Sequence, residues 1–141
     1  MSASEAVGRV LGALFAPVAA LGSLARRARL FHPDGVVYRA DVRAIADEPL
    51  ARALEGTALV RLSAALWRWP ASATRPDILG VAVRFHPGEP TAQDLLFASF
   101  RTTLGLPLAL VTTDVHDFLA NTYSTVLRSR APGLGLVTFR L

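Results

Sequence analysis

The sequence contains no cysteine and no lysine, and its only methionine is Met1. The absence of cysteine excludes disulfide bonds, thiolate nucleophiles and cysteine-ligated metal sites. Any metal ligand must therefore be a histidine, a tyrosine or a carboxylate, and the chain has 3 histidines and 2 tyrosines. A metal site in this chain would therefore be built from these few side chains and the carboxylates.

All 15 basic residues are arginine, and the net charge of +4 rests on guanidinium groups that stay protonated at any working pH. The arginines are scattered, with only Arg26, Arg27 and Arg29 close together. Aromatic residues that would stack on bases do not alternate with them. We therefore expect no direct binding of nucleic acid.

Charged residues make up only 18% of the chain and apolar residues 52%, a balance that argues against disorder. A chain of 141 residues is long enough for one domain that buries a sizeable core. We expect a cytoplasmic protein with an N-terminal apolar helix in residues 1–28 and a single domain in residues 29–141.

Residues 7–28 predict a helix, because apolar side chains recur at helical spacing, with Pro17 as a kink. The uncharged run between Arg9 and Arg26 is short for a membrane span, and its basic cluster follows the run, whereas a signal peptide has its basic residues first. We expect an amphipathic helix that packs on the protein. Peripheral contact with a membrane is the alternative.

Alternating apolar and polar residues predict four strands with short connections, which favour antiparallel pairing. The predicted strands are residues 36–43, 57–63, 80–86 and 94–101. Asp34-Gly35 predicts a turn before the first strand, and Pro49 begins a short helix that ends at Gly56. Residues 67–73 are predicted to form a loop.

The last third of the chain is expected to contain a helix after the fourth strand. Asp114 is a predicted cap for this helix, whose apolar stripe consists of Val115, Phe118, Leu119, Thr122 and Val126. Ala131-Pro132-Gly133 is its expected end. The apolar run 104–112 is either a strand or a buried connection, and residues 134–141 form a last strand-like run.

These elements predict an α+β fold with an antiparallel sheet. Such a sheet has unpaired edges and one apolar face to cover, a problem that closure into a barrel would solve. The predicted strands amount to about half of those in a closed barrel of eight strands.

Four short motifs occur in order along the chain. They are Arg29-x-x-His32, Val60-Arg61-Leu62-Ser63, Asp77-x-x-Gly80-x-Ala82-Val83-Arg84-Phe85 and Asp94-Leu95. Taken one at a time, they have a structural interpretation. His32 would cap a turn, and Arg29 and Arg61 would pair with acidic residues such as Asp34 or Asp77.

The ordered set of motifs resembles the N-terminal part of the haem catalase superfamily, and it is most similar to the small catalase-like proteins of high-GC bacteria. The resemblance covers roughly residues 26–120. It implies that the sheet is half of a catalase-like β-barrel and that the cofactor is haem. It also implies that His32 is the distal acid-base group and that Arg29 and Arg61 meet the haem propionates.

The residue types suit that chemistry. A histidine near its neutral pKa can take a proton from one peroxide oxygen and return it to the other. Arginine presents a planar fork of donors that matches a carboxylate. The substrate implied by the resemblance is hydrogen peroxide or an organic peroxide.

The chain also departs from the family pattern. The family has a distal asparagine where this sequence has Ala98, with Ser99 beside it. The iron ligand of the family is a tyrosine preceded four residues earlier by arginine, whereas Tyr123 has Leu119 at that distance, so no metal ligand is assigned. We expect a truncated form that needs a missing C-terminal half or a partner chain.

Other chemistries find less support. Asp114, His116 and Asp117 are better explained as caps of a helix than as metal ligands, and Ser63 and Ser99 lack a nucleophile-elbow setting. Some short relatives carry a phosphodiesterase label, but the carboxylate-histidine metal centre of such enzymes is missing here. The expected function is haem-linked peroxidase or catalase-like chemistry. The alternative is a non-catalytic interaction module or a dimerising remnant of the same fold.

Overall fold

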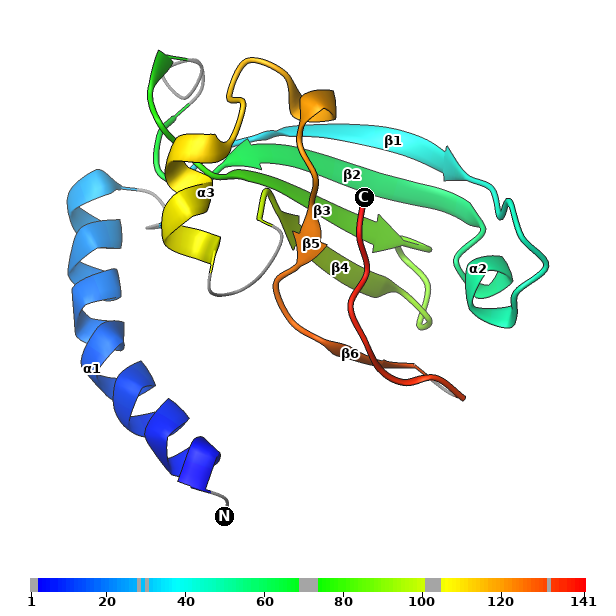
Figure 1. Cartoon of the computed structure of the whole chain (residues 1–141), viewed down its shortest axis with the longest axis horizontal. Helices are drawn as coiled ribbons and strands as arrows, with labels where there is room; N and C mark the ends of the chain where they lie inside the picture. Colours follow the sequence, from blue (N-terminus) through cyan, green and yellow to red (C-terminus); the bar gives the residue numbers. More distant parts are fainter. Residues whose placement is uncertain (1–2, 28, 30, 69–73, 101–104, 132) are drawn as a thin grey trace.

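The computed structural model describes residues 3–27, 29, 31–68, 74–100, 105–131 and 133–141 (Figure 1). Its main sheet has five strands, which pair in the order in which they follow one another along the chain. The strands are β1 (Val36–Val42), β2 (Gly56–Ala64), β3 (Leu79–Phe85), β4 (Gln93–Ala98) and β5 (Ser124–Thr125). All neighbouring pairs are antiparallel, which confirms the predicted α+β fold with an antiparallel sheet.

The register of the strands sorts their side chains onto two faces. Val60 lies opposite Val83, and Ser63 lies opposite Gly80. Side chains alternate between the two faces along a strand, so the pair Val60 and Val83 lies on one face of the sheet and the pair Ser63 and Gly80 on the other. The first face carries Val60, Leu62, Val81, Val83, Leu95 and Phe97. The second carries Arg61, Ser63, Gly80, Ala82, Leu96 and Ala98.

The hydrophobic core lies on the first face. Its buried members are Ala58, Ala64, Leu79, Val81, Val83, Phe85, Phe97 and Tyr123. Phe118 and Phe139 pack against this cluster from the C-terminal segment, which crosses the sheet in orange and red in Figure 1. The segment therefore covers the apolar face that the sheet leaves open.

The sheet is open within the part of the chain that the structure describes. β1 and β5 are its two edges, and they do not pair with each other. Two further strands, β6 (Ser129–Ala131) and β7 (Gly135–Val137), form a separate antiparallel ribbon. The structure therefore supports an open meander and not a closed barrel.

The short helix α2 (Pro49–Ala53) agrees with its prediction, with Pro49 in the first turn. Gly56 follows it with φ of 119°, a conformation that side chains rarely adopt, and it begins β2. The observed limits of the strands differ from the predicted limits by a few residues at most. Arg101 of the predicted fourth strand and residues 69–73 of the predicted loop lie outside the described residues.

The helix predicted from Asp114 is wrong. The helix after the fourth strand is α3 (Leu106–Thr112), in the run for which a strand or a connection was expected. Beyond it, the chain forms the 3-10 helix η3 (Phe118–Ala120), then β5 and β6. Asp114 and Asp117 each accept a hydrogen bond from the backbone N–H two residues ahead, at 2.9 and 2.8 Å. These local bonds favour turns and compete with a helix.

The N-terminal helix α1 (Ala3–Arg26) forms as predicted but does not pack on the domain. Leu14 is 67% exposed and Leu24 76% exposed. The physical reason is that the apolar face of the sheet already packs against Phe118, Tyr123 and Phe139. α1 instead projects to one side of the sheet in Figure 1. Residue 28, the last of the predicted helix, lies outside the described residues.

Candidate functional site

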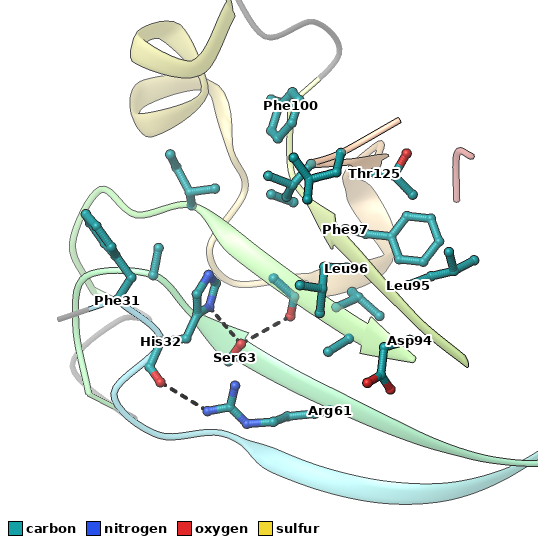
Figure 2. A pocket seen from close by; sticks show the side chains of 18 of the residues that line it. Phe31, His32, Arg61, Ser63, Asp94, Leu95, Leu96, Phe97, Phe100 and Thr125 are labelled. Atoms are coloured by element: carbon teal, nitrogen blue, oxygen red, sulfur yellow. Dashed lines mark hydrogen bonds between the residues drawn. The ribbon is translucent and has the colours of Figure 1, made fainter. Parts of the chain in front are cut away.

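A pocket of about 750 Å³ lies over the second face of the sheet. Its volume is within the range of about 300–1,000 Å³ that is typical of small-molecule sites. Strands β2, β3 and β4 form its floor, and its walls are formed by Arg29, Phe31, His32 and residues 125–129. Figure 2 shows His32, Ser63 and Arg61 close together, with Phe97, Phe100 and Thr125 farther across the pocket.

Most of the pocket wall is apolar, with a few polar side chains. Apolar contributors include Phe31, Leu66, Ile78, Leu96, Phe100 and Val126. The polar side chains are those of Arg29, His32, Arg61, Ser63, Asp94, Thr125, Arg128 and Ser129. An apolar cavity with a few placed polar groups is the usual form of a binding site for a small organic molecule.

His32 is fixed at the wall of the pocket by its backbone and its ring. Its φ is 52°, in the left-handed region, and its N–H donates to the carbonyl of Ala65 at 2.9 Å. The ring Nδ1 lies 2.9 Å from Ser63 Oγ, within hydrogen-bond distance. A Cβ atom on Gly80 would collide with Cε1 of the same ring. The glycine in the third motif therefore makes room for His32.

The surroundings of His32 favour its neutral form. Burial lowers the pKa of His32 below 6.5, and the nearby Arg61 guanidinium lowers it further, whereas Asp77 opposes the shift. The imidazole is consequently uncharged at neutral pH. A neutral ring offers one nitrogen that can accept a proton.

The contacts of Ser63 indicate which ring nitrogen that is. Ser63 Oγ donates a long hydrogen bond of 3.5 Å to the carbonyl of Gly80. When its only proton points there, Ser63 accepts a hydrogen bond from Nδ1–H of His32. In this arrangement Nε2 has the free lone pair. The pair His32–Ser63 then presents a proton acceptor at the pocket wall.

Arg61 holds the loop that carries His32. Its Nη2 atom donates to the carbonyl of His32 at 3.1 Å and to the carbonyl of Asp34 at 2.7 Å. A pairing of Arg61 with the carboxylate of Asp34 or Asp77 was the structural alternative, but both observed acceptors are backbone oxygens. Arg61 therefore positions His32 and also lines the pocket.

Asp77 is fully buried and ties two chain segments together. Its carboxylate accepts hydrogen bonds from the backbone N–H groups of Leu66, Trp67 and Ile78, at 2.9, 2.9 and 2.7 Å. These bonds join the end of β2 to the start of β3. The aspartate of the third motif thus has a structural role beneath the pocket.

The three site residues predicted from sequence, Arg29, His32 and Arg61, all line the pocket. Ala98, which the resemblance to the haem catalase superfamily would align with its distal asparagine, lines it as well. Ser99 does not replace that asparagine, because its Oγ hydrogen-bonds to the N–H of Leu79 at 3.0 Å and to Thr113 Oγ1 at 2.8 Å.

Sequence reasoning missed two contributors to the pocket. Ser63 lies two residues after Arg61 in the second motif, so both side chains share a face of β2, a signal that could have linked Ser63 to His32. Arg128 lines the pocket and is exposed, but its position falls within the helix predicted from Asp114 to Ala131, which does not form. Its position depends on the turns near Asp114, for which the apolar stripe gave no signal.

Metal ligands are not gathered at the pocket. Among the described residues, no cluster of at least three histidine or carboxylate side chains could hold a metal ion. Neither tyrosine lines the pocket, and Tyr123 donates its hydroxyl proton to the carbonyl of Phe118 at 2.9 Å. Burial raises the pKa of Tyr123 to about 12, so it stays protonated.

Comparisons of the chain with protein-family models, with curated proteins and with solved structures find no significant match.

Proposed function

We propose that the pocket binds haem and that His32, supported by Ser63, transfers protons to and from a peroxide in the pocket. The observation that carries the proposal is the hydrogen-bonded pair His32–Ser63 on the wall of a large apolar cavity. The ordered motifs that resemble the haem catalase superfamily support it. The substrate is hydrogen peroxide or an organic peroxide.

The pocket suits a large, flat, apolar molecule with acidic groups at its edge. Its volume of about 750 Å³ and its aromatic and aliphatic walls favour a porphyrin. Arg29, Arg61 and Arg128 supply guanidinium groups at the pocket for two carboxylates. Arg61 Nη2 already serves two carbonyls, so Arg29 and Arg128 are the more accessible partners of the propionates.

An iron ligand other than His32 is not found among the described residues of the pocket wall, where His32 is the only histidine and tyrosine does not occur. We therefore propose that the ligand comes from a partner chain or a further segment. In this proposal, the chain provides the side of the haem site that carries the acid-base histidine, His32.

In this proposal, His32 moves a proton between the two oxygens of a peroxide. Its Nε2 accepts the proton from one oxygen and returns it to the other, so the second leaves as water or an alcohol. Haem iron supplies the electrons for cleavage of the O–O bond when it is bound. Ser63 keeps the ring in one tautomer and orientation, and Arg61 fixes the loop behind it.

The test is an absorption spectrum of the purified chain before and after addition of haemin at equal concentration. We expect a sharp, shifted Soret band that responds to cyanide. Oxidation of a phenolic dye by hydrogen peroxide should fall about 100-fold or more in His32→Asn, because the acid-base group is lost. The spectrum of free haemin, unchanged by the protein, would contradict the proposal.

The chain offers a matched control for that variant. His86 also has a left-handed backbone, with φ of 49°, and its ring hydrogen-bonds to a backbone carbonyl, that of Ala53 at 2.9 Å. It does not line the pocket. His86→Asn should therefore keep the Soret band and the dye oxidation. Equal effects of the two substitutions would argue against a specific role of His32.

A second candidate function rests on the outer edge of β1. This strand pairs only with β2, and Val37 and Tyr38 are 56% and 52% exposed. Such an edge can pair with the same edge of a second copy and form a dimer. If the chain is an interaction module, we expect a dimer that dissociates on dilution and takes up no haemin. A monomer at all concentrations in sedimentation would exclude it.

A further inference from the structure

The helix α1 presents an apolar surface that the domain leaves uncovered. All its large apolar side chains with described exposure are exposed: Val7, Val10, Leu14, Phe15, Val18, Leu21 and Leu24. α1 does not pack extensively against any described strand or helix. We propose that α1 spans a lipid bilayer and holds the sheet domain at its cytoplasmic face.

The uncharged run alone is short for a membrane span, but the helix continues past Arg9, whose long side chain can reach the headgroups from near the end of a span. Residues Ala6–Ala25 form 20 helical residues, which extend about 30 Å at about 1.5 Å per residue. The hydrocarbon core of a bilayer is also about 30 Å thick. The 16 residues between Arg9 and Arg26 contain no charged side chain. A helix that includes Pro17 remains compatible with a span, because proline is tolerated in membrane helices.

The composition around the helix favours a span over a helix that lies in the membrane surface. A surface helix needs a strongly polar face opposite its apolar face. Opposite the large side chains, α1 has the small residues Gly8, Gly12, Ala16 and Ala20. A Cβ atom on Gly8 or Gly12 would meet nothing within 4 Å, so the domain does not cover this side. The helix is therefore apolar all round, as in a membrane span.

The charges at its two ends set the orientation. Arg26, Arg27 and Arg29 follow the apolar run, whereas Glu5 and Arg9 precede it. Arg27 and Arg29 are exposed. Basic residues near the end of a span favour the cytoplasmic side and attract anionic lipid headgroups. The sheet domain, which follows these arginines, thus lies on the cytoplasmic side.

One contact has to open on full insertion. Phe15 stacks on Phe31, with ring centroids 6.4 Å apart and an angle of 6° between the rings. Phe15 lies 11 residues before Arg26, about 16 Å along the helix, so it would sit inside the bilayer. Insertion therefore exchanges one ring pair for the burial of seven large apolar side chains. Phe31→Ala should consequently leave membrane retention unchanged.

The first experiment is expression of the full chain in a bacterial host, followed by alkaline carbonate extraction of the membranes. We expect the intact chain to stay in the membrane pellet, and Leu14→Arg with Val18→Arg to move it to the soluble fraction, because charges at the centre of a span oppose insertion. Val111→Arg is the matched control. Val111 is also exposed, at 71%, but lies on α3, so this variant should stay in the pellet.

Three outcomes would overturn the anchor. These are release of the wild-type chain by carbonate, retention of the Leu14→Arg, Val18→Arg variant, and a mass that shows removal of the N-terminal segment. The first would mean a peripheral helix and the last a cleaved signal sequence. Circular dichroism of the double variant verifies that the sheet domain still folds.

Orientation can be read from single cysteines, because the chain has none of its own. Thr91→Cys lies in the exposed turn before β4. An impermeant maleimide should label it in inverted membrane vesicles but not in intact spheroplasts, and Ser4→Cys should show the reverse. Labelling of Thr91→Cys in intact spheroplasts would overturn the orientation. Arg26→Gln with Arg27→Gln should give mixed labelling, since these residues set the orientation.

Discussion

At the scale of single residues, the site depends on the close approach of the His32 ring to Gly80, which has no side chain. A Cβ atom on Gly80 would collide with Cε1 of His32 and lie 3.3 Å from Ser63 Oγ. Gly80→Ala should therefore destabilise the fold by about 2 kcal/mol and displace the ring. Urea unfolding measures the first effect, and the NMR shifts of the histidine ring measure the second. Gly12→Ala, which meets nothing within 4 Å, should leave the His32 signals in place.

His32 also predicts a dependence of stability on pH. Its pKa is lower in the folded chain than the usual 6.5, so the unfolded chain binds more protons between these two values. The free energy of unfolding should accordingly fall as the pH decreases from about 6.5 to the folded pKa, and it should level off below that. Urea titrations at several pH values measure this loss. It should disappear in His32→Asn and persist in His86→Asn.

Asp77 should be the most sensitive carboxylate in the chain to substitution. It is fully buried and accepts three backbone N–H bonds, which an asparagine can satisfy only in part. We expect Asp77→Asn to cost about 3 kcal/mol in urea unfolding. Asp94→Asn breaks an exposed pair with Arg84 and should cost less than about 1 kcal/mol. Similar losses in the two variants would contradict the assigned role of Asp77.

At the scale of elements, local patterns predicted the sheet and failed for the segment after Thr113. Alternation fixed which residues of β1 to β4 share a face, and therefore placed Arg61 with Ser63. The apolar stripe from Val115 suggested a helix, but side-chain bonds from Asp114, Asp117 and Asn121 stabilise turns instead. Such competition is decided by a few hydrogen bonds and leaves no periodic signal.

The residues of the candidate site could likewise be predicted from sequence only where local patterns or motif order bring them together. Arg29 and His32 are three residues apart, and the pairing of β1 with β2 brings Arg61 next to them, so motif order was sufficient to group these residues. Arg128 reaches the pocket only because the chain turns back through β5. That position is a tertiary property. It could not be inferred from spacing.

The turn after η3 gives a spectroscopic prediction. Burial raises the pKa of Tyr123 to about 12, and its hydroxyl donates to the carbonyl of Phe118. Titration of the tyrosine absorbance should therefore include a step near pH 12 that Tyr123→Phe removes. The same variant should lose about 1 kcal/mol of stability through the missing hydrogen bond. A step that survives in Tyr123→Phe would contradict the assignment.

At the scale of the whole molecule, α1 and the sheet domain should unfold separately. Their one described ring contact is Phe15 on Phe31, which is worth about 1 kcal/mol. In detergent, heating should remove the near-UV signal of the sheet domain while the helical far-UV signal of α1 persists. Coincident transitions would mean that the two parts form one cooperative unit. Phe15→Ala should not shift the near-UV transition.

The order of strands in the sheet has a consequence for synthesis of the chain. Each of β2 to β5 pairs with the strand that was made just before it, so the sheet can grow in the direction of translation. Contacts between neighbouring strands keep sequence separation small, which favours rapid folding. β1 to β4 can thus assemble while later residues are still within the ribosome. Phe118, Tyr123 and Phe139 then complete the nascent domain by closing over its apolar face.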